Sequence, residues 1–401
     1  MLGPPVGGKG YPMHAGHIVL AQLLTFISRW EFRQCVQRYR GDRRVRKFSC
    51  WDQFVVMAFA QLTFRESLRD IEMCLRSLDQ KLYHAGLRAR VARNTLAKAN
   101  ETRDYRIWED LAQTLIAEAR RLHAADPLVA NLQAAAYAFD TTTVDLCLTL
   151  FRWAQFRRRK SAVKLHTLID LRGNIPCFVH ITAGRVREFE ALDQLPIEAG
   201  AYYMLDRGFL DFGRLYRFTQ AQAFFVTRSR RTLACRVLAS RLVDKARGLR
   251  ADQTIRLTGP KTRHRHPAAL RRISYIDPQT GKRYVFLTNN FTLAATTICK
   301  LYHCRWEVEL FFKWIKQNLR IKAFFGTTPN AVKTQIWIAM CAYVLVALVQ
   351  RHLKLQQSMA EILQILSLTL FEKRSLFQLF SHQNTITKEA EKCNPLLFND
   401  I

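Results

Sequence analysis

Two aspartates stand at positions where divalent cations could be held. Asp140 follows the apolar run 136–139 and begins the string Asp-Thr-Thr-Thr, and Asp206 follows the apolar run 202–205 and begins Asp-Arg-Gly. Each is predicted to lie at the carboxyl end of a strand, where α/β folds place their sites. Taken alone, each is more simply a turn or helix-capping residue. Two of them on separate strands favour a cation site, because a divalent cation needs converging oxygen ligands.

A third carboxylate, Glu309, belongs to a segment with a helical pattern. Tyr302, Arg305, Glu309 and Lys316 are three, four and seven residues apart. On an α-helix these steps place all four side chains within an arc of about 60°. Apolar residues fall on the adjoining face, so one helix over 293–320 is predicted to pack by that face and to present the polar row. Without further context, such a row is the solvated face of an amphipathic helix.

Together, Asp140, Asp206 and Glu309 would form a carboxylate cluster for two metal ions about 3.5–4 Å apart, the arrangement used for in-line attack on a phosphodiester. Tyr302, Arg305 and Lys316 could then hold phosphates beside the scissile bond. The predicted chemistry is metal-assisted phosphoryl transfer on a polyanionic substrate.

The elements that must position these residues follow from the hydrophobic pattern. Short strands are predicted at 136–139, 163–171, 175–181, 202–205 and 224–227, with Gly173 and Asn174 as a hairpin turn. Helical stretches at 188–195 and 210–218 separate the later strands and indicate parallel pairing through crossovers. The sequence therefore predicts a mixed α/β sheet. The basic region 229–283 is predicted to be an insertion with strands of its own, placed before the helix of Glu309.

Two basic regions are candidate DNA contacts outside this core. The first 125 residues are predicted to be helical, and their short, arginine-rich helices suit a helix-turn-helix-like DNA reader. A solvated helical domain with basic faces is the alternative. The second basic region, which includes Arg157, Arg158 and Arg159, is expected in a loop. It could bind phosphates non-specifically or simply be a solvated turn. The candidate contacts in the two regions are Arg43, Arg44, Arg46, Lys47, Arg157, Arg158 and Arg159.

The overall composition favours a polyanionic partner. Lys and Arg total 62 against 32 acidic residues, which gives a formal charge of +30, as expected for a protein that binds nucleic acid or an anionic membrane surface. The membrane is disfavoured because the longest apolar run, 336–349, has 14 residues, whereas a spanning helix needs about 20. That run is predicted to be a buried core helix. The 10 cysteines form no CxxC pair, which indicates reduced thiols in the cytoplasm.

These residues resemble a known family. The strings Asp-Thr-Thr-Thr at 140–143, Asp-Arg-Gly at 206–208 and Tyr-x2-Arg-x3-Glu-x6-Lys at 302–316 are similar to those of the DDE transposases of bacterial insertion sequences, in the branch with the YREK signature (insertion-sequence family four). The resemblance covers nearly the whole chain, and the stretch 48–83 resembles the amino-terminal domain of one group of these enzymes. It implies an RNase H-like catalytic core with a strand-rich insertion. It also implies that Asp140, Asp206 and Glu309 are the metal-binding catalytic triad, and that Tyr302, Arg305 and Lys316 contact DNA.

The resemblance further implies an enzyme that binds terminal inverted repeats, cuts the element free and joins its 3′ ends to target DNA. Two Mg²⁺ ions, with Mn²⁺ as a substitute, and a homodimeric synaptic complex are expected in a bacterial, nucleoid-associated protein without membrane contact. The predicted domains are an extension at 1–12, a helical DNA-binding domain at 13–125, the RNase H-like domain at 130–350 and a helical region with a polar tail at 351–401. Two alternatives stay open: a metal-dependent nuclease that does not join ends, and a DNA-binding protein without catalysis.

Overall fold

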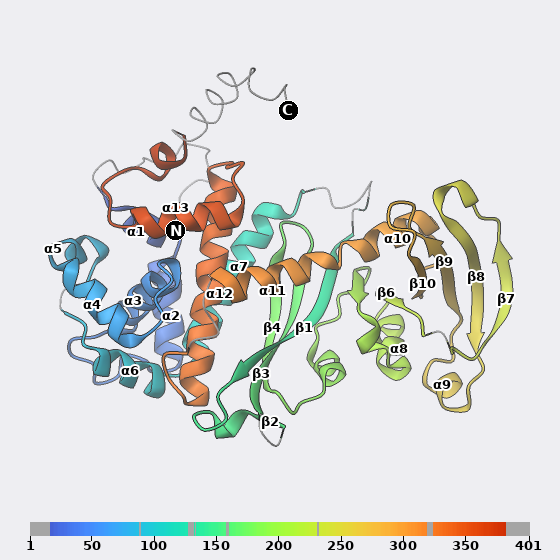
Figure 1. Cartoon of the computed structure of the whole chain (residues 1–401), viewed down its shortest axis with the longest axis horizontal. Helices are drawn as coiled ribbons and strands as arrows, with labels where there is room; N and C mark the ends of the chain where they lie inside the picture. Colours follow the sequence, from blue (N-terminus) through green and yellow to red (C-terminus); the bar gives the residue numbers. More distant parts are fainter. Residues whose placement is uncertain are drawn as a thin grey trace, which may run out of the picture. The chain divides into compact units, whose positions relative to one another are not determined.

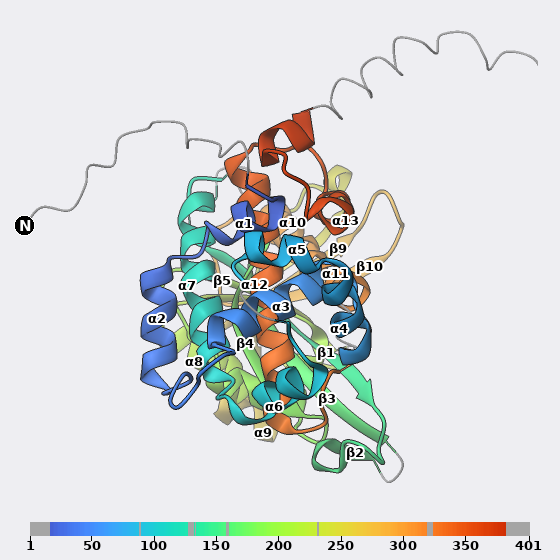
Figure 2. The same ribbon diagram turned by 90° about the vertical axis from the view of Figure 1, so that its left-hand side faces the viewer.

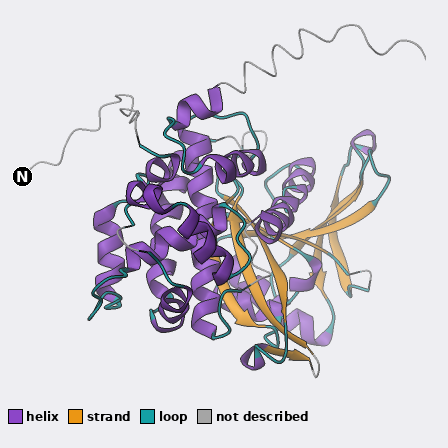
Figure 3. Ribbon diagram, turned by 60° about the vertical axis from the view of Figure 1, so that its left-hand side comes forward, coloured by secondary structure: helices purple, strands orange, loops and turns teal. Residues whose placement is uncertain are grey.

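The computed structural model describes residues 17–87, 90–126, 132, 134–157, 160–230, 232–318 and 324–381. The chain divides into two compact units. One contains residues 116–317 with 327–329, and the other contains residues up to 115 with 318–326 and 330 onward. All described strands belong to the first of these units, and the other is helical (Figure 3). The predicted extension at 1–12 and the tail beyond Ser381 lie outside the described residues.

The strand-containing unit is built on one mixed sheet (Figure 1). Its strands are β1 Ala136–Leu146, β2 Gln155–Arg157, β3 Lys160–Asp170, β4 Ile175–Ala183, β5 Tyr202–Leu205, β6 Phe224–Arg228, β7 Cys235–Arg241, β8 Leu249–Leu257, β9 Leu270–Ile276 and β10 Arg283–Thr288. Their order is β2-β3-β1-β5-β6-β10-β9-β8-β7, with β4 also paired to β3.

The central part of this sheet has the predicted RNase H-like arrangement. Strands β4, β3 and β1 are antiparallel, and β5 and β6 follow in parallel to β1. The hairpin between β3 and β4 turns at Gly173 and Asn174, which both have positive φ values, of 76° and 54°; such values suit glycine and asparagine in a tight hairpin turn. The predicted mixed α/β sheet, with parallel pairing of its later strands, is confirmed.

Alternation along the strands places helices on both faces of the sheet. On β5, Tyr203 and Leu205 pack in a buried cluster with α8 (Phe212–Gln220). The intervening residues Tyr202 and Met204 pack in a second cluster with Leu301 of α10 (Ala295–His303). Because neighbouring strand residues point to opposite faces, a short apolar strand is buried from both sides.

The strands of the predicted insertion do not form a separate sheet. β10, which follows the insertion in the chain, pairs antiparallel with β6. The insertion strands β9, β8 and β7 then follow in antiparallel order. The insertion therefore extends the central sheet on the side of β6. It also carries the short helix α9 (Pro260–Arg265) and the 3₁₀ turn η5 (Lys245–Arg247).

Two helical predictions in this unit are corrected. The stretch 188–195 is a 3₁₀ helix, η3 (Glu188–Gln194), rather than an α-helix. The single helix expected over 293–320 is two helices, α10 and α11 (Trp306–Asn318), separated at Cys304 and Arg305. The N–H groups of Arg305, Glu307 and Val308 bond three residues back, which tightens the turn and interrupts the α-helical ladder. The remaining 3₁₀ helices here are η2 Arg152–Ala154 and η4 Arg207–Phe209.

The other unit is built from helices around α12 (Figure 2). The helices outside the sheet region are α1 Val19–Leu24, α2 Arg29–Arg38, α3 Cys50–Leu62, α4 Leu68–Ser77, α5 Asp79–Leu82, η1 Tyr83–Ala85, α6 Arg93–Thr102, α7 Arg106–His123, α12 Pro329–His352 and α13 Met359–Thr369. Serine side chains cap the N-termini of α2, α3, α4 and α13, which fixes where these helices begin.

Helix α12 is apolar on all sides and is the core of its unit. Every residue from Ala331 to Val349 except Lys333 is buried. It is the one helix among the described residues that is long and apolar enough to cross a membrane, but 94% of its most apolar window is buried inside the protein. A helix that is hydrophobic all round belongs in a core when other helices cover it. The prediction of a buried core helix over 336–349 is confirmed.

Candidate active site

Asp140 lies in the interior of a long strand, not at its end. β1 continues past Asp140 to Leu146, paired with β3 along that whole length. On its other side, the parallel pairing with β5 ends at Phe139, opposite Leu205. The prediction that Asp140 ends a strand is therefore wrong, because the antiparallel partner carries β1 further than its parallel neighbour does. Asp140 still occupies the first position at which β1 has lost β5 as a neighbour.

Asp206 directly follows β5 and has two polar partners. Its Oδ1 accepts a hydrogen bond from the Arg228 guanidinium at 2.7 Å and one from the Tyr302 hydroxyl at 3.3 Å. Arg228 ends β6, the parallel neighbour of β5, and Tyr302 lies in the last turn of α10. Asp206 is thus bonded to the Arg228 guanidinium of the neighbouring strand and to the hydroxyl of Tyr302, the first residue of the predicted polar row.

Glu309 and Asp140 share one guanidinium. Arg305, at the turn between α10 and α11, places one terminal nitrogen 2.5 Å from Glu309 Oε1 and the other 3.3 Å from Asp140 Oδ2. The structure therefore brings five of the six predicted residues of the triad and the polar row into one site. Arg305 is the positive group between two of the three carboxylates.

The surroundings of Asp140 disfavour its charge. Burial raises the pKa of Asp140 to about 6, and the nearby carboxylates of Asp206 and Glu309 act in the same direction, whereas Arg305 opposes them. Like charges held close together in a partly buried site raise carboxyl pKa values. The raised pKa of Asp140 therefore comes mainly from its burial, and the two other carboxylates add smaller contributions.

Asp206 and Tyr302 respond differently to the same surroundings. Burial works against ionisation of Asp206, but the Arg207 N–H and the Arg228 guanidinium outweigh it and lower the pKa of Asp206. Burial raises the pKa of Tyr302 to about 12, with the Asp206 carboxylate adding to the shift. At neutral pH the Tyr302 hydroxyl is therefore a hydrogen-bond donor to an ionised Asp206.

Lys316, the last member of the row, turns to the backbone. Its Nζ donates a hydrogen bond of 2.9 Å to the carbonyl oxygen of Thr143, three residues after Asp140 on β1. This contact ties α11 to β1 close to the site. Because α10 ends at His303 and α11 begins at Trp306, the row lies across the turn between the two helices rather than on one unbroken helix.

The candidate contacts in the basic regions lie apart from this cluster in the sequence. Arg43, Arg44, Arg46 and Lys47 are exposed in the connection between α2 and α3. Arg157 is exposed but belongs to strand β2, where it pairs with Lys160, rather than to a loop. Arg158 and Arg159 lie outside the described residues.

Arg228 is a member of the site that the sequence reasoning missed. It follows the apolar run 224–227, which was itself predicted to be a strand. Arg228 is the last residue of β6, and residues at the carboxyl ends of such strands lie where α/β folds place their sites. Its guanidinium balances the charge of Asp206 as Arg305 balances that of Asp140 and Glu309.

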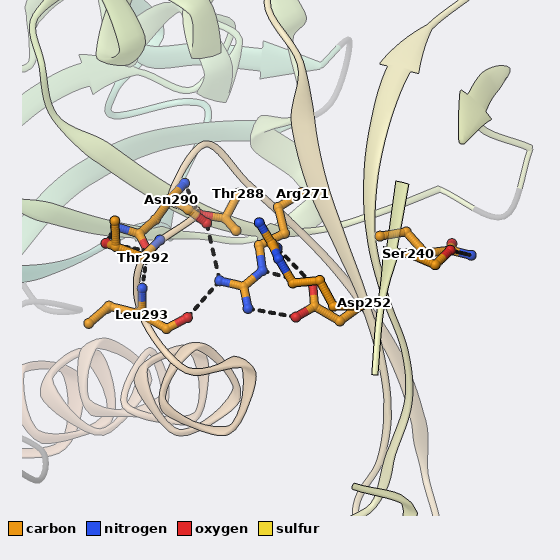
Figure 4. Close-up of polar contacts among 9 residues, drawn as sticks. Ser240, Asp252, Arg271, Thr288, Asn290, Thr292 and Leu293 are labelled. Atoms are coloured by element: carbon orange, nitrogen blue, oxygen red, sulfur yellow. Dashed lines mark hydrogen bonds and ion pairs between the residues drawn. The ribbon is translucent and has the colours of Figure 1, made fainter. Parts of the chain in front are cut away.

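A buried ion pair connects the insertion to the start of α10 (Figure 4). Arg271 of β9 binds both carboxylate oxygens of Asp252 on β8, at 2.8 and 2.7 Å. The same guanidinium donates to the carbonyl oxygens of Asn290 and Leu293 in the loop that leads into α10. Since α10 carries Tyr302, this network helps to set the position of a site residue from within the insertion.

The donor set suits a hard divalent cation. Aspartate and glutamate oxygens are the ligands that Mg²⁺ prefers, and here two of the three carboxylates already share one positive group. Among the described residues, no three His, Cys, Asp or Glu side chains lie close enough to hold a single ion. The carboxylates therefore fit a divalent cation in chemical type, while the positive charge between Asp140 and Glu309 in this structure is the Arg305 guanidinium.

Two family comparisons cover most of the chain. Residues 132–345, more than half of the sequence, match the family described as the transposase DDE domain. Residues 15–88 match a domain of unknown function, DUF4372.

Proteins that carry transposase names are similar to this chain. One from Sinorhizobium fredii, y4zB, is 32% identical over 59% of this chain and 67% of its own length. One for an insertion sequence element of Geobacillus stearothermophilus is 32% identical over 51% of this chain and 54% of its own length. One from Synechocystis, for the element IS4SA, is 22% identical over 70% of this chain and 79% of its own length. A solved piggyBac transposase synaptic complex with hairpin DNA aligns with a TM-score of 0.45, at 10% identity, over 96% of this chain and 84% of that one.

The mixed sheet, with acidic residues beside its parallel strands and on a following helix, agrees with the transposase DDE domain that the family comparison matches over 132–345. The chain belongs to the transposase DDE domain family, and the predicted resemblance to the DDE transposases of insertion sequences is confirmed.

Proposed function

We propose that this transposase binds the terminal inverted repeats of its insertion sequence, cleaves the phosphodiester bonds at the element's ends and joins the 3′ ends to target DNA. The observation that carries the proposal is that Arg305 bonds both Asp140 and Glu309, while Tyr302, three residues before Arg305, bonds Asp206. Binding a polyanion alone does not require three partly buried carboxylates within one charged network, since negative charges there oppose a negatively charged partner.

In this proposal, Asp140, Asp206 and Glu309 would hold two Mg²⁺ ions, with Mn²⁺ as a substitute. When bound, such ions activate the attacking oxygen and stabilise the leaving oxygen of an in-line displacement. The chain's own groups orient the carboxylates: Arg228 and Tyr302 hold Asp206, and Arg305 holds Asp140 and Glu309.

The arginines and Tyr302 also support a polyanionic substrate. The Nε atoms of Arg305 and Arg228 are buried and have no hydrogen-bond partner among the described residues. An unsatisfied buried donor costs about 1–3 kcal/mol, and a phosphate oxygen is an acceptor that arginine binds well. We therefore assign Tyr302, Arg305 and Lys316 to contacts with the DNA next to the cleaved bond. We further propose that the protein acts as a homodimer in the synaptic complex and is associated with the nucleoid in the bacterial cytoplasm.

The substitution Glu309→Gln tests the carboxylate assignment. It should lower the cleavage rate of DNA carrying the element's ends at least about 100-fold, because the loss of a charged ligand removes several kcal/mol of transition-state stabilisation. Binding of the same DNA should stay nearly unchanged. The matched control is Glu307→Gln on the same helix, since Glu307 instead accepts a hydrogen bond from Asn174 at 2.8 Å.

The reaction itself is tested by incubating the protein, Mg²⁺ and a supercoiled plasmid that carries the element's ends. Joined products support transposition. Nicked or linear plasmid without joined products would reassign the protein as a nuclease, and a shifted but uncut band would reduce it to a DNA-binding protein. Cleavage by Glu309→Gln at the wild-type rate would remove Glu309 from the site.

A further inference from the structure

The Arg305 guanidinium bonds the same carboxylates on which a divalent cation would depend. One terminal nitrogen lies 2.5 Å from Glu309 Oε1, and the other lies 3.3 Å from Asp140 Oδ2. The Arg305 side chain is 13% exposed, whereas those of Asp140 and Glu309 are 21% and 33% exposed. A cation bound between these two carboxylates would therefore lie beside a largely buried positive group, and the two charges would repel each other.

The third carboxylate is engaged in a similar way. Asp206 Oδ1 accepts hydrogen bonds from the Arg228 guanidinium and from the Tyr302 hydroxyl. Each of the three predicted metal ligands thus has one oxygen bonded to a donor side chain of this chain. For such a site, these donors and a divalent cation are competing partners of the carboxylates.

The bonds to the carboxylates do not satisfy Arg305 completely. Its Nε is buried and has no hydrogen-bond partner among the described residues, and an unsatisfied buried donor destabilises the arrangement that contains it. Arginine binds a phosphate through two neighbouring nitrogens. A pair of nitrogens that includes Nε also needs a terminal nitrogen that a carboxylate now holds. A phosphate would therefore satisfy Nε and draw the guanidinium away from Asp140 or Glu309.

Both carboxylates keep a stabilising contact when Arg305 moves. Asp140 Oδ1 accepts a hydrogen bond of 2.8 Å from the Thr141 N–H, and Arg305 bonds the other oxygen. Glu309 lies in the first turn of α11, where the helix dipole favours a negative charge. Arg305 itself belongs to neither helix, because α10 ends at His303 and α11 begins at Trp306. The guanidinium can therefore change partners without breaking a helix.

We propose that Arg305 is a positioning residue that exchanges partners. It bonds Asp140 and Glu309 in the DNA-free protein, and it moves to a phosphate when an element end binds, which leaves the two carboxylates to a divalent cation. Binding of DNA and binding of the cation then favour each other. Protein without an element end holds the cation weakly, which limits cleavage of other DNA. The inference rests on the proposed function for the DNA contact of Arg305.

A fixed brace is the competing description of Arg305. In that case the guanidinium keeps its bonds to Asp140 and Glu309 after DNA binds. DNA would then raise the affinity for the cation by the same factor whether or not position 305 carries an arginine. The two descriptions therefore differ in a measurable coupling between the DNA and the cation.

The first test measures Mn²⁺ binding to the full-length protein without DNA, by electron paramagnetic resonance of the free ion. Arg305→Gln should lower the Mn²⁺ dissociation constant at least about 10-fold, because it removes the competing charge. The matched control is Arg207→Gln, which removes an exposed cation next to Asp206. It should change the constant less than about twofold, since solvent and salt screen an exposed charge. Equal constants for the wild type and Arg305→Gln would overturn the proposal.

The second test repeats the titration with a saturating duplex of one element end. The duplex is already cut at the terminus and lacks the 3′ hydroxyl, so that neither cleavage nor joining occurs. DNA should lower the Mn²⁺ dissociation constant of the wild type at least about 10-fold more than that of Arg305→Gln. Comparing the two gains removes the contribution of DNA phosphates that bind Mn²⁺ in both proteins. Equal gains would identify a fixed brace and overturn the exchange.

Thermal unfolding of each variant shows whether the fold is intact, and Arg305→Lys provides a second, conservative variant. Lysine keeps the positive charge but cannot bond both carboxylates through a planar fork. The Mn²⁺ dissociation constant of Arg305→Lys without DNA should therefore lie between those of the wild type and Arg305→Gln. A constant no higher than that of Arg305→Gln would show that the charge does not compete with the cation, and would contradict the exchange.

The plasmid assay separates this outcome from the proposed function. A wild-type protein that neither cuts nor joins, but gains more Mn²⁺ affinity from DNA than Arg305→Gln does, would contradict the catalytic proposal and leave the exchange standing. A wild-type protein that joins ends while the two gains are equal would contradict only the exchange.

Discussion

Arg305 gives the active site much of its electrostatic character. Without its guanidinium, Asp140 and Glu309 would face each other with no positive group bonded to both. Burial and the Tyr302, Glu309 and Asp140 side chains act on Arg305 together, burial opposing the charge and the others outweighing it, so that the pKa of Arg305 is raised. The family resemblance assigns this residue to DNA, and the structure shows that it also organises the carboxylates.

A second residue-level feature is a buried neutral histidine next to the site. His166 on β3 is fully buried, and its two ring nitrogens lie 2.7 Å from the Thr141 hydroxyl and 2.9 Å from the Thr182 hydroxyl. Burial lowers the pKa of His166 to about 3, with His180 and Lys164 adding to the shift. His166 is therefore a packed residue of the sheet, bonded to threonines of the two neighbouring strands.

His166 should make the protein sensitive to acid. Because its pKa is lower in the folded chain than in the unfolded one, the unfolded state binds an extra proton between about pH 3 and 6.5, and stability falls as the pH drops through that window. Between pH 7 and pH 5 this one group should lower the free energy of unfolding by about 2 kcal/mol. Denaturant unfolding at both pH values should show a pH effect smaller by about that amount in His166→Gln. The exposed-site control is His264→Gln, and an undiminished pH effect in His166→Gln would refute the assignment.

At the scale of elements, two features help to set the position of Tyr302. They are the turn between α10 and α11, and the hydrogen bonds from Arg271 of the insertion to the loop before α10. Tyr302, in the last turn of α10, bonds Asp206. Arg305, in the turn that follows, bonds both Asp140 and Glu309. The insertion contributes through Arg271, which bonds the loop before α10. Strands far from the carboxylates in sequence are thereby connected to the helix that completes the site.

The ion pair of Arg271 and Asp252 should be important for stability as a pair. Both side chains are almost fully buried, at 4% and 6% exposure, and removing one partner leaves an uncompensated buried charge, at a cost of about 3–5 kcal/mol. Arg271→Met should therefore destabilise the protein by that amount in denaturant unfolding. The double variant Arg271→Met/Asp252→Leu should recover much of the loss. If the double variant is no more stable than the single one, the pair is not what holds these strands to the loop.

At the scale of the whole molecule, a charge of +30 is distributed over a chain whose acidic residues are partly committed to internal contacts. Asp52 caps a helix, Asp252 is buried with Arg271, and Asp206 is held by Arg228. The excess of lysine and arginine therefore remains at the surface to a large extent. That favours association with a polyanion over long distances, before any specific contact forms.

Affinity for DNA should therefore depend steeply on ionic strength. A protein that makes six to ten phosphate contacts loses roughly 10³–10⁵-fold in affinity between 50 and 200 mM salt. Full-length protein and a duplex of the element's end, titrated over that range, should show a loss of about 10³-fold or more. A flat titration would contradict binding through phosphates and with it the DNA partner.

The sequence by itself determined the strands, the mixed sheet and the family. Short apolar runs followed by polar residues are local patterns, and they located β1, β5 and β6 together with Asp140 and Asp206. The helical spacing likewise located Tyr302, Arg305 and Glu309, because side chains near one another on a helix are set by local geometry.

Only the tertiary structure decided how these residues meet. The break between α10 and α11, the continuation of β1 beyond Asp140 and the sharing of Arg305 by two carboxylates depend on partners distant in the chain. Local periodicity carries no information about which strand lies beside which helix, and it is those neighbours that fix hydrogen-bond partners, burial and pKa values.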